Sequence, residues 1–348
     1  MTMSAEVNWN LRESNFPKNG STGDKLGFAL KLALMASSEL ARQTWHFRVE
    51  AEHVELFAHD PQKPEASDPD DRESFIHCGA GLFYLKLALK HFGFLGRVEL
   101  FPDLDQPALV ARVFAGSGRE RDAQESALFA AMTRDHVNFT LLDECPASAA
   151  TLDLLRYAAM GERAWLEFAH SEFSRQRLFS LATVQPHAAG ESRPTRQDLS
   201  IPTGARSAGT RSASMTPRQP AVPESVWAGP FLSLSVHASN SDRLTVRSGE
   251  EATGQWTALA IIKSRTDDKY GWVAAGQAAA RVLLYAEISG LAWSFLNRAL
   301  HSRAAREELL TGMGRKGFPQ IVIRFGSKTP LTTLQPAVSR SVTATARV

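Results

Sequence analysis

GWVAAGQAAARVLLYAEISGLAWSFLN, residues Gly271–Asn297, is the stretch that decides the fold. Its alanines and larger apolar side chains cover nearly every direction of a 3.6-residue helix. This predicts a helix that is buried almost all round and ends at Gly290 in a left-handed conformation. The two interior charges, Arg281 and Glu287, make the stretch a poor membrane span.

A near copy of this stretch, CGAGLFYLKLALKHFGF, lies upstream at Cys78–Phe94. Gly79 aligns with Gly276, and Gly93 aligns with Gly290. Two central helices that share their glycine spacing indicate a duplicated unit rather than one simple domain.

A second pair of similar segments supports the repeat. KLALM at Lys31–Met35 lines up with RYAAM at Arg156–Met160, and a Trp-led strand follows each of them. The connection before the strand is longer in the first copy (Ala36–Thr44) than in the second (Gly161–Ala164). The duplication is therefore asymmetric, and any function of the long connection is present once per chain.

The overall composition limits the classes of function. The chain has 348 residues with 43% hydrophobic composition, enough for two domains or one large fused one. Its net charge of +2 gives no global sign of nucleic-acid binding. Two cysteines form no disulfide framework, and the N-terminal residues hold no apolar signal core, so we expect a cytoplasmic protein without a membrane segment.

Composition shifts suggest five segments along the chain. We expect a flexible N-terminal arm (1–23), a first half (24–122), the start of a second half (123–182), a linker or lid rich in Pro, Ser and Arg (183–225), and the remainder of the second half (226–348). A disordered spacer is the plainer interpretation of the fourth segment, because it has too few large apolar side chains to order itself. Its five arginines come with no aromatic platform, so we expect no nucleic-acid partner.

The local patterns predict the helices and strands. We expect helices at Leu26–Met35, Ala123–Met132, Ser148–Ala159, Phe173–Ala182 and Ser302–Leu310, and strands at Trp45–Val49, Val54–Ala58, Arg97–Phe101, Trp165–Ala169, Val226–Val236, Thr257–Lys263 and Gln320–Phe325. Residues Pro107–Phe114 suit either an edge strand or a short helix.

Several familiar site motifs are absent or incomplete. Gly79-Ala80-Gly81 resembles the start of a dinucleotide-binding pattern, but Tyr84 stands where the third glycine belongs. The histidines and cysteines have no zinc-site spacing, so we expect no metal site. Cys78 lies on an apolar helix face, which indicates a buried structural thiol.

The connection from Ser37 to Trp45 is more informative. It carries Ser38 and Gln43 between an apolar helix and an aromatic strand. Hydroxyl and carboxamide groups there can bond the polar rim of a planar heterocycle, while Trp45 anchors the strand. A capped helix end followed by a turn explains the same residues without a ligand.

In this order the motifs resemble a known family. The chain is similar to the Acg-type branch of the FMN-dependent nitroreductase superfamily over roughly residues 25–345. The resemblance rests on ASSELARQTWHF (36–47), HCGAGLFYLKLAL (77–89), LFAAMTRDHVNF (128–139), AAGQAAARVLLYAEISGLAWSFLN (274–297) and GFPQIVIRFG (317–326).

The resemblance implies an α+β fold in which two nitroreductase-like halves are fused, each with a central buried helix and an antiparallel sheet. The fused chain would imitate the family's usual homodimer as an intramolecular pseudo-dimer, compatible with a monomer. It implies FMN as cofactor, NAD(P)H as electron donor and a small electron-poor acceptor as substrate. The chemistry would belong to the flavin, and no side chain is singled out as a catalytic acid or base.

The resemblance also implies which residues bind the flavin. Ring-edge contacts would come from the first-half connection and from the turn after the last long helix, and phosphate contacts from a box in the second half and from the C-terminal tail. The implied residues are Ser38, Gln43, Gly290, Leu291 and Ser294 for the ring system, and Arg134, His136, Asn138 and Arg340 for the phosphate.

Three positions depart from the family pattern. Ala41 stands where the family has Asn, and Asp135 and Phe139 stand where it usually has arginines. An aspartate repels a phosphate dianion, and the loss of arginines removes bidentate contacts. These changes support an alternative, a non-catalytic or flavin-sequestering protein that keeps the fold.

Overall fold

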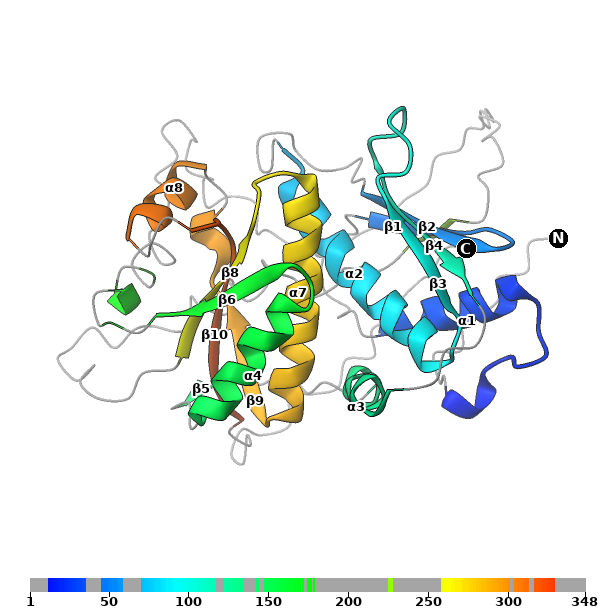
Figure 1. Ribbon diagram of the computed structural model, residues 1–348, viewed down its shortest axis with the longest axis horizontal. Helices are drawn as coiled ribbons and strands as arrows, with labels where there is room; N and C mark the ends of the chain where they lie inside the picture. Colours follow the sequence, from blue (N-terminus) through cyan, green and yellow to red (C-terminus); the bar gives the residue numbers. More distant parts are fainter. Residues whose placement is uncertain are drawn as a thin grey trace, which may run out of the picture.

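The computed structural model describes residues 12–35, 45–58, 70–116, 122–133, 142–143, 147–169, 171, 174–176, 178, 225–227, 258–300, 303–312 and 316–328. Helices and antiparallel sheets form two similar halves, which confirms the predicted α+β class. Two long helices, α2 and α7, lie side by side in the middle, with one sheet on each side of the pair (Figure 1).

The first half contains one sheet, whose strands pair in the order β3-β4-β2-β1-β7. Its last strand, β7, comes from far along the chain and pairs with β1 through His46↔Trp227. The elements are η1 (Glu13–Asn15), α1 (Thr22–Met35), β1 (Trp45–Val49), β2 (His53–Ala58), α2 (Arg72–His91), β3 (Leu95–Leu100), β4 (Leu109–Ala115) and β7 (Ser225–Trp227).

The second half contains the other sheet, ordered β5-β10-β8-β6, with β9 also paired to β10. Helix α3 contacts both long helices. The elements are α3 (Ala123–Met132), β5 (Leu142–Asp143), α4 (Ala149–Met160), β6 (Ala164–Phe168), β8 (Ala258–Ser264), α7 (Lys269–Ile288), β9 (Leu291–Phe295), η3 (Asn297–Leu300), α8 (Arg303–Gly312) and β10 (Phe318–Lys328).

The two halves repeat the same plan. Strands β3-β4-β2-β1 of the first sheet match β9-β10-β8-β6 of the second in order. Helices α2 and α7 each run for 20 residues. After each helix comes one capping residue and then a glycine in the left-handed conformation. These glycines are Gly93, at φ 74°, and Gly290, at φ 73°. The predicted stop of α7 at Gly290 is confirmed.

The contact between α2 and α7 is reciprocal. A Cβ added at Gly79 would lie 2.1 Å from the carbonyl oxygen of Val273, one at Gly276 would lie 1.9 Å from that of Ile76, and each of these carbonyls stands three residues before the partner glycine. Only glycine allows the two backbones to approach this closely. Gly79 is therefore a residue of α2 that packs against α7. This packing accounts for the glycine of the incomplete dinucleotide pattern, so no bound phosphate is needed to explain it.

Most predicted elements are confirmed, one prediction is corrected, and some predictions lie outside the described residues. β4 (Leu109–Ala115) is a strand, but the prediction of an edge position is wrong because β3 and β2 pair with its two sides. Within the predicted arm, Phe16 is buried and stacks on Phe92 with ring centroids 4.0 Å apart. Most of the predicted strand Val226–Val236 and of the helix Phe173–Ala182 lies outside the described residues, and the segment boundaries stay predictions.

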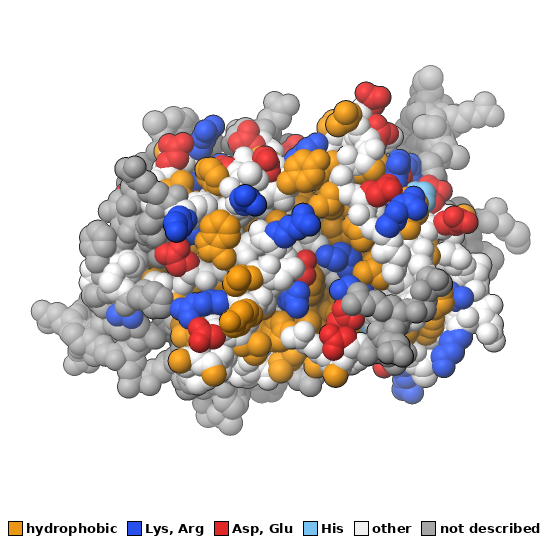
Figure 2. Space-filling model, viewed as in Figure 1, with side chains coloured by type: hydrophobic (Ala, Val, Ile, Leu, Met, Phe, Trp, Pro, Cys, Tyr) orange, Lys and Arg blue, Asp and Glu red, His pale blue; other side chains and the backbone are white. Residues whose placement is uncertain are grey.

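The surface carries charges of both signs. On the face drawn in Figure 2, basic and acidic side chains are interspersed with hydrophobic ones. This agrees with the small net charge of +2. Cys78 is buried in α2, and burial raises the pKa of its thiol well above the usual value, which confirms the predicted structural thiol.

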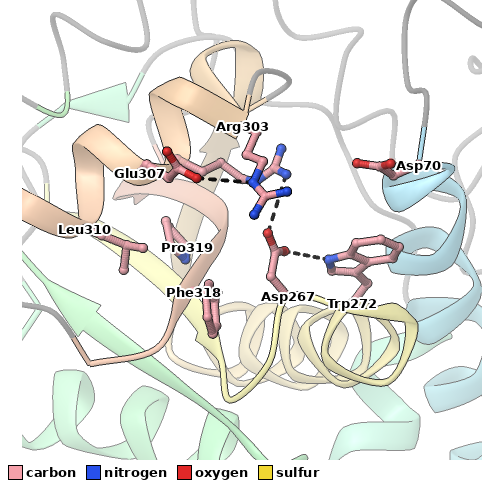
Figure 3. Close-up of a pocket in the computed structure, with 9 residues that line it drawn as sticks. Asp70, Asp267, Trp272, Arg303, Glu307, Leu310, Phe318 and Pro319 are labelled. Atoms are coloured by element: carbon pink, nitrogen blue, oxygen red, sulfur yellow. Dashed lines mark hydrogen bonds and ion pairs between the residues drawn. The ribbon is translucent and has the colours of Figure 1, made fainter.

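A polar network also ties the two halves together. Arg72, near the start of α2, donates through Nε to Oε1 of Gln320 on β10 at 2.8 Å. Gln320 Nε2 and Trp272 Nε1 both donate to Oδ1 of Asp267, at 2.9 and 2.8 Å. Arg306 of α8 lies 3.5 Å from the other carboxylate oxygen of Asp267. Figure 3 shows this carboxylate beside Trp272 in a cavity of about 240 Å³.

The network lowers the pKa of Asp267. Burial alone would raise it, but the hydrogen bonds from Gln320 and Trp272 and the charges of Arg306 and Arg72 outweigh burial. A carboxyl group with a lowered pKa stabilises the fold above its unfolded-state pKa of about 3.9, and this contribution is lost as the pH falls through the folded-state value.

We predict that Gly79→Ala and Gly276→Ala each lower the free energy of unfolding by about 2–3 kcal/mol, because the added methyl forces the central helices apart. Gly27 of α1 is the control, since a Cβ there meets nothing within 4 Å. Gly27→Ala should stabilise by about 0.5–1 kcal/mol, because alanine is the better helix former. Urea unfolding measures all three, and equal effects at the three sites would contradict the close approach.

We predict that Asp267→Asn lowers the free energy of unfolding at pH 7 by about 1–2 kcal/mol, because the charge that Arg306 and Arg72 stabilise is lost. The difference from the parent should shrink below about pH 3, where the parent carboxylate is protonated too. Urea unfolding at both pH values tests this. Asp70→Asn, on the exposed rim of the same cavity, should change stability by less than about 0.5 kcal/mol.

Candidate functional site

The predicted flavin site is described only in part. Ser38, Gln43, Arg134, His136, Asn138 and Arg340 lie outside the described residues, and so do Ala41, Asp135 and Phe139. Gly290, Leu291 and Ser294 are described, and they lie together at the end of α7 and along β9. The roles of all nine predicted residues stay predictions.

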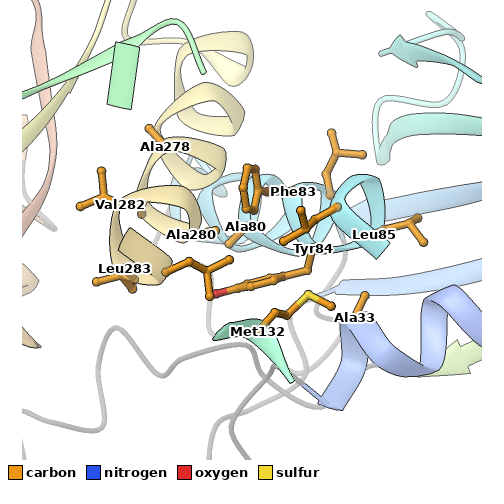
Figure 4. Close-up of a cluster of buried hydrophobic side chains, with 14 of the residues drawn as sticks. Ala33, Ala80, Phe83, Tyr84, Leu85, Met132, Ala278, Ala280, Val282 and Leu283 are labelled. Atoms are coloured by element: carbon orange, nitrogen blue, oxygen red, sulfur yellow. The ribbon is translucent and has the colours of Figure 1, made fainter. Parts of the chain in front are cut away.

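The helices that precede the predicted flavin-binding segments pack into one apolar cluster. Figure 4 shows Ala33 near the end of α1, Met132 at the end of α3, Tyr84 of α2 and Leu283 of α7 among its side chains. The chain leaves α1 towards Ser38, α3 towards Arg134 and α7 towards Gly290. All three predicted segments therefore start from elements that pack on the same part of the α2–α7 pair.

The turn after α7 has space for a ligand. Ser289 caps the helix by donating its N–H to the carbonyl of Tyr285, and Gly290 then takes φ 73°. A Cβ at Gly290 would meet nothing within 4 Å among the residues that the structure describes. A ligand could approach the Gly290 backbone as closely as glycine permits.

Strand β9 lies beside this open turn. It pairs only with β10 among the described strands, from Leu291↔Ser327 to Ile323↔Phe295. Leu291 is buried and Ser294 is half-buried, opposite Arg324 of β10. The outer edge of β9 therefore offers backbone donors and acceptors to a ligand, as an unpaired strand edge does.

Trp45, the first residue of β1, directly follows the connection that is predicted to bind the flavin ring. Its ring packs on Gly81 of α2, where an added Cβ would lie 3.0 Å from the indole, and meets Phe47 edge to face at 5.0 Å. Its indole Nε1 is buried and has no hydrogen-bond partner among the residues that the structure describes. An unpaired buried N–H costs about 1–3 kcal/mol, so a ligand acceptor there would be favoured.

Comparison with known proteins finds homologues that are named nitroreductases. No family model matches this chain. "Putative NAD(P)H nitroreductase Rv3131" of Mycobacterium tuberculosis H37Rv is 28% identical over 303 residues, which cover 85% of this chain and 83% of that protein. "Putative NAD(P)H nitroreductase acg" of the same strain is 31% identical over 97 residues, or 28% of this chain and 29% of that protein.

The chain is therefore a homologue of proteins named putative NAD(P)H nitroreductases, acg among them. This confirms the resemblance inferred from the ordered motifs. Two solved structures are also similar to this chain: a "Putative NADH dehydrogenase/NAD(P)H nitroreductase" from Bacteroides thetaiotaomicron (15% identity, 63% of this chain, 92% of that one) and a "Nitroreductase with Bound FMN" from Bacteroides fragilis (12%, 65% and 99%). Both superpose with a TM-score of 0.32, which adds nothing to the fold described above.

A cleft between the two halves was not predicted. It measures about 1090 Å³ and lies against α2, β3, the α4–β6 turn and the start of α7. Its turn, Gly161–Arg163, occupies the place in the second half that residues 36–44 occupy between α1 and β1 in the first half. The turn is therefore the counterpart of the connection that carries Ser38 and Gln43. The short second connection was visible in the sequence, but the open space that it leaves was not.

Among the residues that the structure describes, no group of three or more His, Cys, Asp or Glu side chains could hold a metal ion. Within the same ranges, no helix is both long and apolar enough to cross a membrane.

Proposed function

We propose that this chain is an FMN-binding oxidoreductase of the nitroreductase type that uses NAD(P)H to reduce a small, electron-poor acceptor. The observation that carries the proposal is the homology to proteins named NAD(P)H nitroreductases over most of both chains. The open left-handed turn at Gly290 and the unpaired N–H of Trp45 fit a planar, polar-edged cofactor.

The protein would hold the cofactor from both halves. When bound, FMN would take up a hydride and release electrons to the acceptor. Ser38 and Gln43 would bond the ring edge, together with the backbone at Gly290 and Leu291 and the strand that carries Ser294. Arg134, His136, Asn138 and Arg340 would contact the phosphate with charge-assisted hydrogen bonds.

The proposed assembly follows from the same two halves. A cofactor held between them needs no second chain, so we expect the intramolecular pseudo-dimer to act as a monomer. NAD(P)H and the acceptor would be its small-molecule partners. The cysteine usage suggests the cytoplasm as its compartment.

The direct test is an anaerobic titration. The purified full chain is incubated with FMN, freed of excess and mixed with NADPH or NADH. We expect a retained flavin absorption band that either nucleotide bleaches and a nitroaromatic or quinone restores. A protein that retains no flavin band after reconstitution would contradict the proposal.

We predict that Gly290→Ala weakens FMN binding about tenfold, because a methyl group would occupy the space at the turn. Gly93→Ala is the matched control, since Gly93 has nearly the same φ at the equivalent turn of the first half. Both variants should lose about 1–2 kcal/mol of stability through backbone strain. Flavin fluorescence titration with urea unfolding separates the two effects. Equal FMN affinity in both variants would show that Gly290 does not approach the ligand.

A second function is favoured by a specific observation. Asp135, Phe139 and Ala41 replace residues that the family uses around the flavin. Two lost charge-assisted bonds of about 1.5–3 kcal/mol each would weaken binding by about 10²–10⁴-fold. The alternative is therefore a protein that keeps the fold and sequesters flavin, or binds it weakly, without turnover.

We predict that the double variant Asp135→Arg with Phe139→Arg binds FMN at least about tenfold more tightly than the parent, because it restores cations beside the phosphate. Equilibrium dialysis with FMN and with riboflavin, which lacks the phosphate, measures the effect. The gain should appear for FMN alone. No gain for FMN would mean that residues 134–139 do not contact the phosphate.

A further inference from the structure

The second cleft has the size of a ligand site and is built from both halves. Its volume of about 1090 Å³ lies slightly above the range of about 300–1,000 Å³ that is usual for small-molecule pockets. Its apolar floor comes from Leu82, Val98 and Leu100, and its rim comes from the α4–β6 turn and the start of α7. Because the turn is short where the first half has residues 36–44, the cleft stays open.

The rim of the cleft carries uncompensated positive charge. Glu162 is its one acid and is already neutralised, since Lys86 Nζ and Arg281 Nη1 each lie 3.2 Å from its carboxylate. Lys86 also donates to Gln277 Oε1 at 2.6 Å. In contrast, the guanidinium groups of Arg163 and Arg265 have no hydrogen bond or ion pair with any described residue. Two free arginines at one opening favour an anionic ligand.

Two aromatic side chains and a methionine line the cleft together with these arginines. Trp165 packs closely over Gly317, where an added Cβ would lie 2.0 Å from the indole ring, so the ring is held in place. Tyr270 meets Phe101 edge to face at 4.6 Å and is 50% exposed, and Met160 is 61% exposed.

The backbone of the rim is strained. Arg163 has φ 62°, a left-handed conformation that is unfavourable for a residue with a Cβ. The turn holds it there through Arg163 N–H to the carbonyl of Met160 at 3.1 Å. Non-glycine residues held in this conformation cluster at binding sites. Here the strain places an arginine at the mouth of the cleft.

We propose that this cleft binds a flat aromatic anion, such as an aryl carboxylate or sulfonate, at a site separate from the flavin. The ring lies against Trp165 and Tyr270 over the apolar floor, and the anion pairs with Arg163 and Arg265. Flavin itself is not the ligand here, because the turn Gly161–Arg163 has no serine or glutamine to match Ser38 and Gln43.

The test is calorimetric titration of the full chain with 2-naphthoate in the presence of saturating FMN. We expect saturable binding of one naphthoate per chain, and at least about tenfold weaker binding of the neutral analogue 2-naphthamide. The double variant Arg163→Gln with Arg265→Gln should weaken naphthoate binding at least about tenfold. Arg303→Gln, which removes an exposed arginine at another cavity, should leave naphthoate binding unchanged.

Several results would overturn the proposal. Equal affinity in the double variant and the parent would place the naphthoate elsewhere. Competition between FMN and naphthoate would place it in the flavin site. No saturable binding would show that the cleft takes no aromatic anion. Each outcome is independent of turnover, since a chain without oxidoreductase activity can still bind the probe.

Discussion

The structure depends on the close, reciprocal contact between two helices. Gly79 and Gly276 each face the backbone of the other helix where no side chain would fit. This contact brings α2 and α7 together over their lengths and buries most of both helices. Each sheet packs against its own helix, so the position of one half relative to the other is set mainly at these glycines. The Arg72–Gln320–Asp267 network adds a polar connection at one end of the pair.

Two positions on the molecule are related by this repeat. One is the predicted flavin site, whose residues follow the ends of α1, α3 and α7 in the sequence. The other is the cleft beside the turn where the chain passes directly from α4 to β6. Similar halves therefore need not bind the same ligand twice. One connection carries the serine and glutamine suited to a flavin edge, and the other carries an arginine in a strained backbone.

Much of the fold could be predicted because its signals are local. Helix α7 is buried almost all round, as predicted. Helix α3 (Ala123–Met132) has the predicted bounds, and Ser148 caps α4 as expected, accepting the N–H of Thr151 at 3.1 Å. The spacing of Gly79 and Gly276 revealed the repeat but not which backbone each glycine faces. That contact, the Asp267 network and the second cleft join residues far apart in the sequence, none of which has a distinctive pattern by itself. For the flavin site, the family resemblance supplied what residue types alone left open.

The most direct test is the flavin stoichiometry of the full chain, measured by calorimetric titration with FMN and by the flavin content of the reconstituted protein. Because only the first of the two similar halves has a connection with the serine and glutamine suited to a flavin edge, we predict one FMN per chain. Two FMN per chain would show that the second cleft is an equivalent flavin site, and no binding would show that the fold is kept without its cofactor.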